Sequence, residues 1–428
     1  MGATRPAWMR LAPILAAGFL LEIFLLGLVD IDNFRQEIPR FLTLYLFLFL
    51  AYLAAVRHVL GAPSDRLLWW ILGFAMLFRA TALFIEPGLS DDIYRYLWDG
   101  KVLNHGINPY LYAPSAPELA PLRDALYETI NHKHIGTPYG PVMIAFFAVA
   151  ERLAHSVFVM KLAFLLADGL VIALLVRLLR ASNRPASHVL IYAWSPLVLV
   201  EVAGNGHNDV LAILFLLGAL ALLMRGSLWK VSLGLALAIA SKYLALLFLP
   251  ALWRRLGRTG RVLLPLTLIA AFLPFHQALA QHADSLFAVG SAWRFNDSLF
   301  TIIRFMTGSD TLSRIIAAVL FLLLAAFVYR REQPVLKGAM MLIGGALLLT
   351  TTLQPWYLLW IVPFLCFYPN RAWILLTGLV MLSYQVLTRY AAEGVWLESP
   401  WIKYAIYLPF FALLIADAWK NRRLHEAH

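Results

Sequence analysis

Cysteines and charged residues are scarce in this chain of 428 residues. Charged residues make up only 14% of it, against roughly 25% in a typical soluble domain. The single cysteine, Cys366, excludes a disulfide within the chain and a cysteine-based metal site. Because 61% of the residues are hydrophobic, the composition instead indicates an integral membrane protein.

The apolar runs are long and do not alternate with polar residues, which predicts membrane-spanning helices. The expected fold class is all-α: a polytopic transmembrane bundle of about 14 spans, with residues 1–428 forming one integral membrane domain. The first run lacks a convincing signal-peptide cleavage site and is interpreted as a retained anchor. The predicted spans are 11–29, 41–58, 67–86, 158–179, 187–203, 209–224, 228–241, 242–254, 261–280, 311–329, 335–352, 354–368, 373–389 and 401–419.

The net charge of +11 comes from arginines and lysines in short turns, which indicates membrane orientation rather than nucleic-acid binding. These turns all fall on one side if both termini are cytoplasmic. Residues 139–155 are apolar, but a crossing there would move every later cluster outside, so we interpret them as juxtamembrane or re-entrant. Residues 87–157 and 276–310 then form non-cytoplasmic loops. The cations used are Arg5, Arg10, Arg57, Arg66, Arg177, Arg180, Arg184, Arg225, Lys230, Arg254, Arg255, Arg258, Arg261, Arg330, Arg331, Lys420, Arg422 and Arg423.

The first non-cytoplasmic loop opens with SDDIYRYLWDG, residues 90–100. We expect a short helix with Ser90 as its N-cap and with Asp91 and Asp92 in the first turn, where the helix dipole favours negative charge. Gly106 and the Asn108-Pro109 pair should end it. Capping and solubility would account for the two acids. The tyrosines and the tryptophan around them also suit a sugar or headgroup site at the membrane surface.

Two ordered motifs carry a resemblance to a known family. Ser90, Asp92, Tyr94 and Tyr96 match S-x-D-x-Y-x-Y, and Gly106, Pro109 and Tyr110 match G-x-x-P-Y. Together with the multi-span pattern, from about Phe84 to about Trp360, they resemble the GT-C class of polyprenyl-phosphate-sugar-dependent glycosyltransferases, and bacterial membrane mannosyltransferases in particular. One departure is that the family's Y-P-P appears here as Tyr139-Gly140-Pro141.

The resemblance implies transfer of a hexose, mannose being one candidate, from a polyprenyl-phosphate sugar to a lipid- or glycan-linked acceptor. The reaction would take place at the outer face of the bacterial cytoplasmic membrane and would invert the anomeric centre. An ionised carboxylate would serve as general base, and the motif favours Asp92 over Asp91. A sugar nucleotide would need a soluble glycine-rich domain, which this sequence lacks.

The leaving polyprenyl phosphate needs cations or hydrogen-bond donors. Lys242 is the first candidate, as a lone cation in an apolar hinge at Ser241-Lys242-Tyr243. Simple snorkelling to the interface is the alternative explanation. Arg294 and His207 are further candidates, with an ordinary interfacial arginine and histidine as alternatives.

Further polar and aromatic residues are expected to bind substrate. Asp209 resembles a second acidic position of the family, although it could instead cap a helix. Gln354, Trp356 and Tyr357 occupy an aromatic turn suited to sugar stacking, or to an ordinary aromatic belt. The predicted substrate-binding residues are Arg95, Tyr96, Trp98, Asn108, Tyr110, Tyr139, Asp209, Gln354, Trp356 and Tyr357. No cofactor and no metal are expected.

Two other functions remain open at this stage. A transporter or lipid flippase would show inverted repeats and acids at mid-membrane, whereas these acids cluster at the interface. An envelope polysaccharide polymerase or ligase would rely on loops rich in arginine and histidine.

The topology gives a first testable prediction. Reporter fusions after Arg184 and within residues 114–121 should report opposite sides of the membrane, with the first site cytoplasmic. Reporter activity on one side for both fusions would contradict the juxtamembrane assignment of residues 139–155.

Overall fold

The computed structural model describes residues 7–331 and 333–426, and these form helices joined by turns, with a single isolated β-bridge between Phe295 and Thr352. The all-α fold class is thus confirmed. Arg5 lies outside the described residues, as do the side chains of Arg10, Arg422 and Arg423. Their place in the predicted orientation therefore stays a prediction.

The first half of the chain supplies a helical bundle and the loop that follows it. Its elements are α1 (Ala7–Val29), α2 (Ile38–Gly61), η1 (Asp65–Leu67), α3 (Leu68–Ala82), α4 (Asp92–Asn104), η2 (Pro117–Leu122), η3 (Ala125–Thr129), α5 (Pro141–Leu153), α6 (Val157–Ala181), η4 (Ala186–Val189), α7 (Leu190–Ala193), α8 (Pro196–Val198), η5 (Leu199–Gly204) and α9 (Asp209–Met224).

The second half is broken into more pieces. Its elements are α10 (Leu228–Ser241), η6 (Tyr243–Phe248), α11 (Leu249–Leu252), η7 (Trp253–Leu256), α12 (Gly257–Phe272), η8 (Leu273–Ala278), α13 (Leu279–Ala292), α14 (Leu299–Thr307), α15 (Asp310–Arg330), α16 (Val335–Leu349), η9 (Pro355–Trp360), α17 (Val362–Leu365), α18 (Arg371–Leu379), η10 (Val380–Gln385), α19 (Val386–Glu393) and α20 (Pro400–Glu426).

Within residues 7–331 and 333–426, seven helices are long and apolar enough to cross a membrane, or up to eight if the bent pair 186–193 and 196–204 counts as one span. Three shorter apolar helices, α9, α10 and α16, accompany them. The predicted number of about 14 spans therefore stays a prediction. Helix α5 has 13 residues, about 20 Å in length, and is too short to cross the roughly 30 Å hydrocarbon core.

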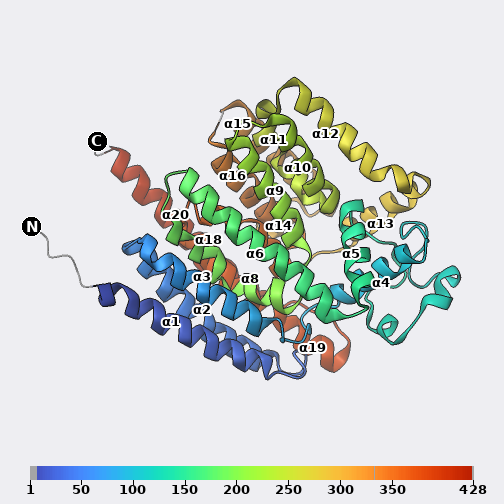
Figure 1. The fold of residues 1–428 in the computed structure, drawn as a ribbon, viewed down its shortest axis with the longest axis horizontal. Coiled ribbons are helices and arrows are strands. Elements are labelled where there is room, and N and C mark those ends of the chain that lie inside the picture. The colour runs from blue at the N-terminus through green and yellow to red at the C-terminus, as the bar shows by residue number, and fades with distance from the viewer. Residues whose placement is uncertain (1–6, 332, 427–428) are drawn as a thin grey trace, which may run out of the picture.

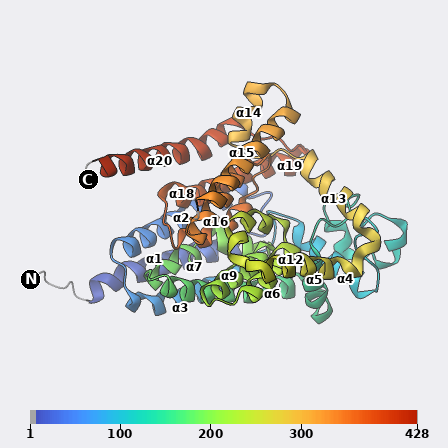
Figure 2. The ribbon, with the colours of Figure 1, turned by 90° about the horizontal axis from the view of Figure 1, so that it is seen from above.

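The two ends of the bundle differ in what they carry. The start of α1 and the end of α20 lie at one end, and α4, α5 and α13 lie at the opposite end, in both views (Figures 1 and 2). The first non-cytoplasmic loop predicted from sequence therefore gathers at the end remote from the termini.

Two breaks in the helices bring polar residues into this bundle. Pro196 begins the second half of the pair that is bent by 49°, as expected of a residue that lacks a backbone N–H, and the pair ends in a π-helical turn containing Glu201. The other break is at Lys242, whose extended backbone (φ −149°, ψ 124°) separates α10 from η6. The hinge predicted at Ser241-Lys242-Tyr243 is confirmed.

A buried ion pair ties three parts of the bundle together. The Arg79 Nε atom donates to Asp168 Oδ2 at 2.6 Å, and its Nη1 donates to the Ala193 carbonyl at 2.7 Å. The Tyr192 hydroxyl donates to the other oxygen of Asp168 at 2.6 Å. Both charged side chains are almost fully buried, so each depends on the other for compensation.

Loss of this pair gives a stability prediction. Arg79→Met leaves Asp168 buried with one neutral donor, so we expect a loss of about 3–5 kcal/mol in the free energy of unfolding. The exposed Arg66 provides the matched control, and Arg66→Met should leave the thermal unfolding midpoint in detergent unchanged. Equal midpoints for the two variants would show that the buried pair contributes nothing.

Candidate active site

The acidic motif begins α4 as the sequence predicts, displaced by one residue. The helix starts at Asp92 with Asp91 in the N-cap position, so the prediction of Ser90 as N-cap is wrong. The Ser90 hydroxyl still accepts the Asp92 backbone N–H at 3.3 Å. The helix ends at Asn104, and Gly106 follows with a left-handed backbone (φ 75°), as expected of a residue without a Cβ.

The two aspartates have different partners. Asp91 Oδ1 lies 2.5 Å from Arg35 Nη2, in an ion pair whose side chains remain about a third exposed. Asp92 receives a neutral hydrogen bond instead, from Asn131 Nδ2 to its Oδ1 at 3.0 Å. Within the described residues no lysine or arginine forms an ion pair with Asp92, so its carboxylate is the less compensated of the two.

The surroundings of Asp92 make it a stronger base than an ordinary aspartate. Its side chain is 26% exposed, which leaves it accessible. Burial raises its pKa above the ordinary value, and the charges of Asp91 and Asp209 raise it further, while Asn131 and Lys242 oppose the shift. A carboxyl group with a raised pKa binds a proton more tightly, as a general base at neutral pH requires.

Lys242 is held in an ion pair with Asp209. Its Nζ atom lies 2.5 Å from Asp209 Oδ2 and 3.2 Å from Asn208 Oδ1. Asp209 is fully buried, and its other oxygen accepts the Trp360 indole N–H at 2.6 Å. The interpretation of Lys242 as a lone cation is therefore wrong. The break after α10 meets the first turn of α9, where Asp209 lies, and the sequence alone does not show this contact.

His207 lies behind Asp92 in the same cluster. Its ring is stacked on Trp356 with the centroids 4.0 Å apart, and its Nδ1 lies 4.0 Å from Asp92 Oδ2. Its Nε2 lies 3.3 Å from Glu201 Oε2, and the side chain is 1% exposed. The preceding Gly206 has φ 73°, and a Cβ there would overlap Ile93 of α4, so glycine permits this close approach.

The aromatic turn completes the wall beside the lysine. Gln354 precedes Pro355, which begins η9, and Trp356 packs edge-on against Tyr357. The Lys242 ammonium lies 5.8 Å from the centroid of the Tyr357 ring. The structure therefore brings Asp92, His207, Asp209 and Lys242 to the same place as the predicted sugar-stacking turn.

A close approach of the loop to α10 explains the departure at Gly140. A Cβ at this position would overlap the carbonyl oxygen of Ala240, two residues before Lys242. A proline ring would meet the same obstacle. The neighbouring Tyr139 packs edge-on against Tyr96 and stays partly exposed.

Other predicted substrate-binding residues of α4 are engaged inside the loop. Arg95 donates to Asp99 Oδ1 at 2.9 Å and to the Ile135 carbonyl at 3.0 Å, and both charged side chains are buried. Tyr96 stacks on Phe147 of α5 with the ring centroids 4.6 Å apart. Trp98 is also buried, with its ring 5.2 Å from that of Tyr127.

The G-x-x-P-Y segment is likewise occupied by local contacts. Asn108 Oδ1 accepts the Tyr110 backbone N–H at 3.0 Å, and the Tyr110 hydroxyl donates to the Tyr139 carbonyl at 2.7 Å. These contacts hold the loop around Asp92. Direct contact of Arg95, Tyr96, Trp98, Asn108 and Tyr110 with a substrate stays a prediction.

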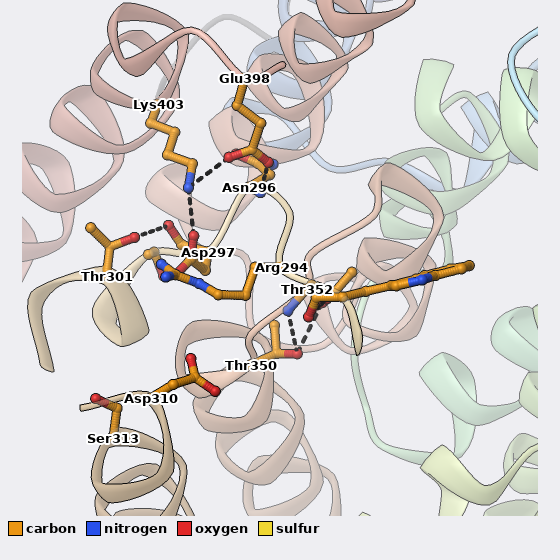
Figure 3. Close-up of polar contacts among 12 residues, drawn as sticks. Arg294, Asn296, Asp297, Thr301, Asp310, Ser313, Thr350, Thr352, Glu398 and Lys403 are labelled. Carbon is orange, nitrogen blue, oxygen red and sulfur yellow. Dashed lines mark hydrogen bonds and ion pairs between the residues drawn. The ribbon is translucent and has the colours of Figure 1, made fainter. Parts of the chain in front are cut away.

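Arg294 belongs to a separate ionic cluster in the second loop, drawn in Figure 3. Its Nη2 lies 2.8 Å from Asp297 Oδ2, and Lys403 of α20 bonds the other oxygen of the same carboxylate. Burial works against ionisation of Asp297, but these two cations outweigh it and hold its pKa below the ordinary value. Arg294 is 40% exposed, and its predicted contact with the donor phosphate stays a prediction.

Several residues around the site were not predicted from sequence. Arg35 had a usable signal, because it is a cation in the turn between the first two spans, which the sequence predicts to be non-cytoplasmic, contrary to the positive-inside rule. Asn131, Glu201 and Trp360 gave no signal for their partners, because the hydrogen bonds to Asp92, Tyr384 and Asp209 each join residues far apart in the chain.

No group of three or more histidine, cysteine, aspartate or glutamate side chains that could hold a metal ion occurs in residues 7–331 and 333–426. The site in the described chain consists of carboxylates, one lysine, one histidine and aromatic rings.

The fold and the site together define a polytopic helical membrane protein with a carboxylate and lysine centre at one end of its bundle. A family model described as alpha-(1->6)-mannopyranosyltransferase, N-terminal domain, matches residues 36–258. The chain therefore belongs to this family. The matched segment contains Asp91, Asp92, His207, Asp209 and Lys242.

A curated relative supports this assignment. The chain is 29% identical over 241 residues to alpha-(1->6)-mannopyranosyltransferase A of Mycobacterium tuberculosis (strain ATCC 25618 / H37Rv). The alignment covers 52% of this chain and 44% of the relative, so the chain spans less than half of that protein's length. No solved structure matches the chain.

The lysine pair gives a prediction about folding. Lys242→Met leaves the fully buried Asp209 without its cation, so we expect a loss of about 3–5 kcal/mol in the free energy of unfolding. The double variant Lys242→Met/Asp209→Asn removes both charges and should recover most of that loss. Thermal unfolding in detergent measures both, and a stable single variant would show that the pair is not required for folding.

Proposed function

We propose that this protein is a membrane mannosyltransferase that transfers mannose from a polyprenyl-phosphate donor to a lipid- or glycan-linked acceptor. The observation that carries the proposal is the meeting of Asp92 with the Lys242–Asp209 pair at one end of a membrane bundle. No lysine or arginine in the described part of the chain forms an ion pair with Asp92. Family membership and the name of the mycobacterial relative support mannose as the sugar.

Asp92 acts as the general base. It takes the proton from the acceptor hydroxyl while that oxygen bonds to the anomeric carbon, and the bond from this carbon to the phosphate oxygen breaks. A direct displacement inverts the anomeric centre, so a β-linked donor gives an α-linked product. Asp91 is less suited to this role, because Arg35 already compensates its charge at 2.5 Å.

Lys242 stabilises the leaving phosphate. An ammonium group has three N–H donors, and two of those on Lys242 are directed to Asn208 and Asp209. The third remains for a phosphate oxygen, and the side chain is 23% exposed. Asp209 thus holds Lys242 in place. Its role is to position the lysine rather than to contact the sugar directly.

A lipid-linked donor suits the position of this centre. The backbone breaks at Lys242, where α10 ends, two residues after the Ala240 carbonyl that faces Gly140 at the start of α5. Helix α5 lies at the opposite end of the bundle from the start of α1 and the end of α20 (Figure 1). If the termini are cytoplasmic, this is the outer face of the cytoplasmic membrane, where a polyprenyl chain lies in the bilayer with its phosphate at the surface. Trp356 and Tyr357 then offer ring faces beside the lysine for the mannose.

A donor panel tests the function. Purified protein in nanodiscs is incubated with polyprenyl-phosphate mannose, polyprenyl-phosphate glucose or a mannose nucleotide, together with a mannoside acceptor. We expect transfer from the first donor and none from the nucleotide. Transfer from the nucleotide would contradict the lipid-linked donor, and ATP- or gradient-driven movement of a lipid without any transfer would indicate a flippase.

Asp92 gives the prediction for catalysis. Asp92→Asn keeps the size of the side chain but removes its basicity, so turnover should fall by at least about 100-fold with the donor KM largely unchanged. Asp91→Asn should cost less, because its charge is already paired. The exposed Asp32 in the turn after α1 is the matched control, and Asp32→Asn should keep full turnover. Full activity of Asp92→Asn would make the acidic pair structural.

A further inference from the structure

His207 is the buried polar side chain whose bonding is least satisfied near the site. Its exposed fraction is 1%, and neither ring nitrogen has a hydrogen-bond partner in the described structure. Buried polar groups usually have partners, because an unpaired donor or acceptor costs roughly 1–3 kcal/mol. Both nitrogens nevertheless face a carboxylate: Nε2 is 3.3 Å from Glu201 Oε2, and Nδ1 is 4.0 Å from Asp92 Oδ2.

The surroundings of Glu201 decide which nitrogen carries the hydrogen. The Tyr384 hydroxyl donates to Glu201 Oε1 at 2.8 Å, and Asn205 Nδ2 donates to Oε2 at 3.2 Å. A carboxylate that receives donors on both oxygens acts as an acceptor. When Glu201 is ionised, the neighbouring Nε2 presents its N–H to it, because a lone pair facing an accepting oxygen would repel it. A protonated Glu201 would instead donate to Nε2 and place the hydrogen on Nδ1, and the measurements below distinguish the two forms.

The hydrogen on Nε2 leaves a lone pair on Nδ1, directed to Asp92. Burial and the charge of Lys242 lower the pKa of His207 well below its ordinary value, so the imidazole stays neutral. A lone pair and an ionised carboxylate cannot form a hydrogen bond, which accords with the 4.0 Å that separates Nδ1 from Asp92 Oδ2. Once Asp92 gains a proton, its O–H has an acceptor beside it.

We propose that His207 is a positioning residue that strengthens Asp92 as a base by accepting a hydrogen bond from its carboxyl O–H only after the acceptor proton has arrived. This rests on the proposed function. The acceptor O–H bond breaks, the glycosidic bond forms, the phosphate leaves with the electron pair, and the proton stays on Asp92 until the product departs. A bond that exists only as the proton arrives lowers the barrier without tightening substrate binding.

His207 then has a different role from the contact with the donor phosphate that the sequence predicts. The imidazole is covered by Trp356, with the ring centroids 4.0 Å apart and an interplanar angle of 17°. A donor phosphate would have to displace that ring to reach it. Other charges near Asp92 are already paired, Asp91 with Arg35 and Asp209 with Lys242, so the uncharged ring is the neighbour that can respond to the proton.

Two substitutions separate the hydrogen bond from packing. His207→Phe keeps a ring on Trp356 but removes both nitrogens, whereas His207→Gln keeps a donor for Glu201 and an acceptor for Asp92. We expect kcat to fall about 10- to 100-fold for the Phe variant with unchanged KM for donor and acceptor, and less for the Gln variant. His105→Phe, an exposed histidine at the end of α4, is the control and should keep full activity.

A double-variant cycle tests the dependence on Asp92. If His207 acts through the Asp92 proton, adding His207→Phe to Asp92→Asn should cause no further loss of kcat. Full additivity of the two losses, or an unchanged kcat for His207→Phe beside an inactive Asp92→Asn, would overturn the inference while leaving the proposed function intact.

An infrared measurement decides the same point without turnover. The C=O stretch of protonated Asp92, identified by its absence in Asp92→Asn, should move to higher frequency in His207→Phe because its O–H loses an acceptor. If the C=O band of Asp92 had the same frequency in the wild type and in His207→Phe, the inference would be overturned. If the wild type transfers no sugar from any polyprenyl-phosphate donor, the proposed function fails, and this band still shows whether His207 accepts the bond.

Discussion

The ion pair between Lys242 and Asp209 is the interaction on which the site depends. Its two residues lie at the broken end of α10 and the first turn of α9, and the Trp360 indole closes the far side of the carboxylate. A fully buried aspartate at the end of a membrane bundle costs several kcal/mol unless a cation compensates it. The pair therefore holds three segments together and also presents the lysine to the site.

The three aspartates of the site differ in whether a cation compensates their charge. Asp91 and Asp209 each lie 2.5 Å from a cation, whereas Asp92 receives a neutral donor from Asn131. Burial of an incompletely compensated carboxylate favours its protonated form, which is why Asp92 suits proton abstraction. The same electrostatic rule that stabilises the bundle thus favours Asp92 as the proposed base.

The first loop contributes rigidity as well as the acidic pair. The Arg95–Asp99 pair is buried within α4, and Tyr96 packs against Phe147 of α5. Tyr110 packs against Phe275 of η8 and His282 of α13. The second loop meets the first next to Asp92, where the Trp293 ring lies 4.7 Å from that of His132, the residue after Asn131. A carboxylate that must meet two substrates gains from such support, because small displacements of reacting groups are costly.

The sequence by itself determined the apolar segments, the short helix at the acidic motif and the hinge at Lys242, because these follow from residues adjacent in the chain. The sequence also pointed to Asp92, although it predicted Ser90 as the N-cap of α4, where the structure has Asp91. Only the tertiary structure decided the partners: Arg35 for Asp91, Asp209 for Lys242, and Tyr384 for Glu201. Partners depend on which helix ends meet in space, and neither hydrophobic periodicity nor local motif spacing records that.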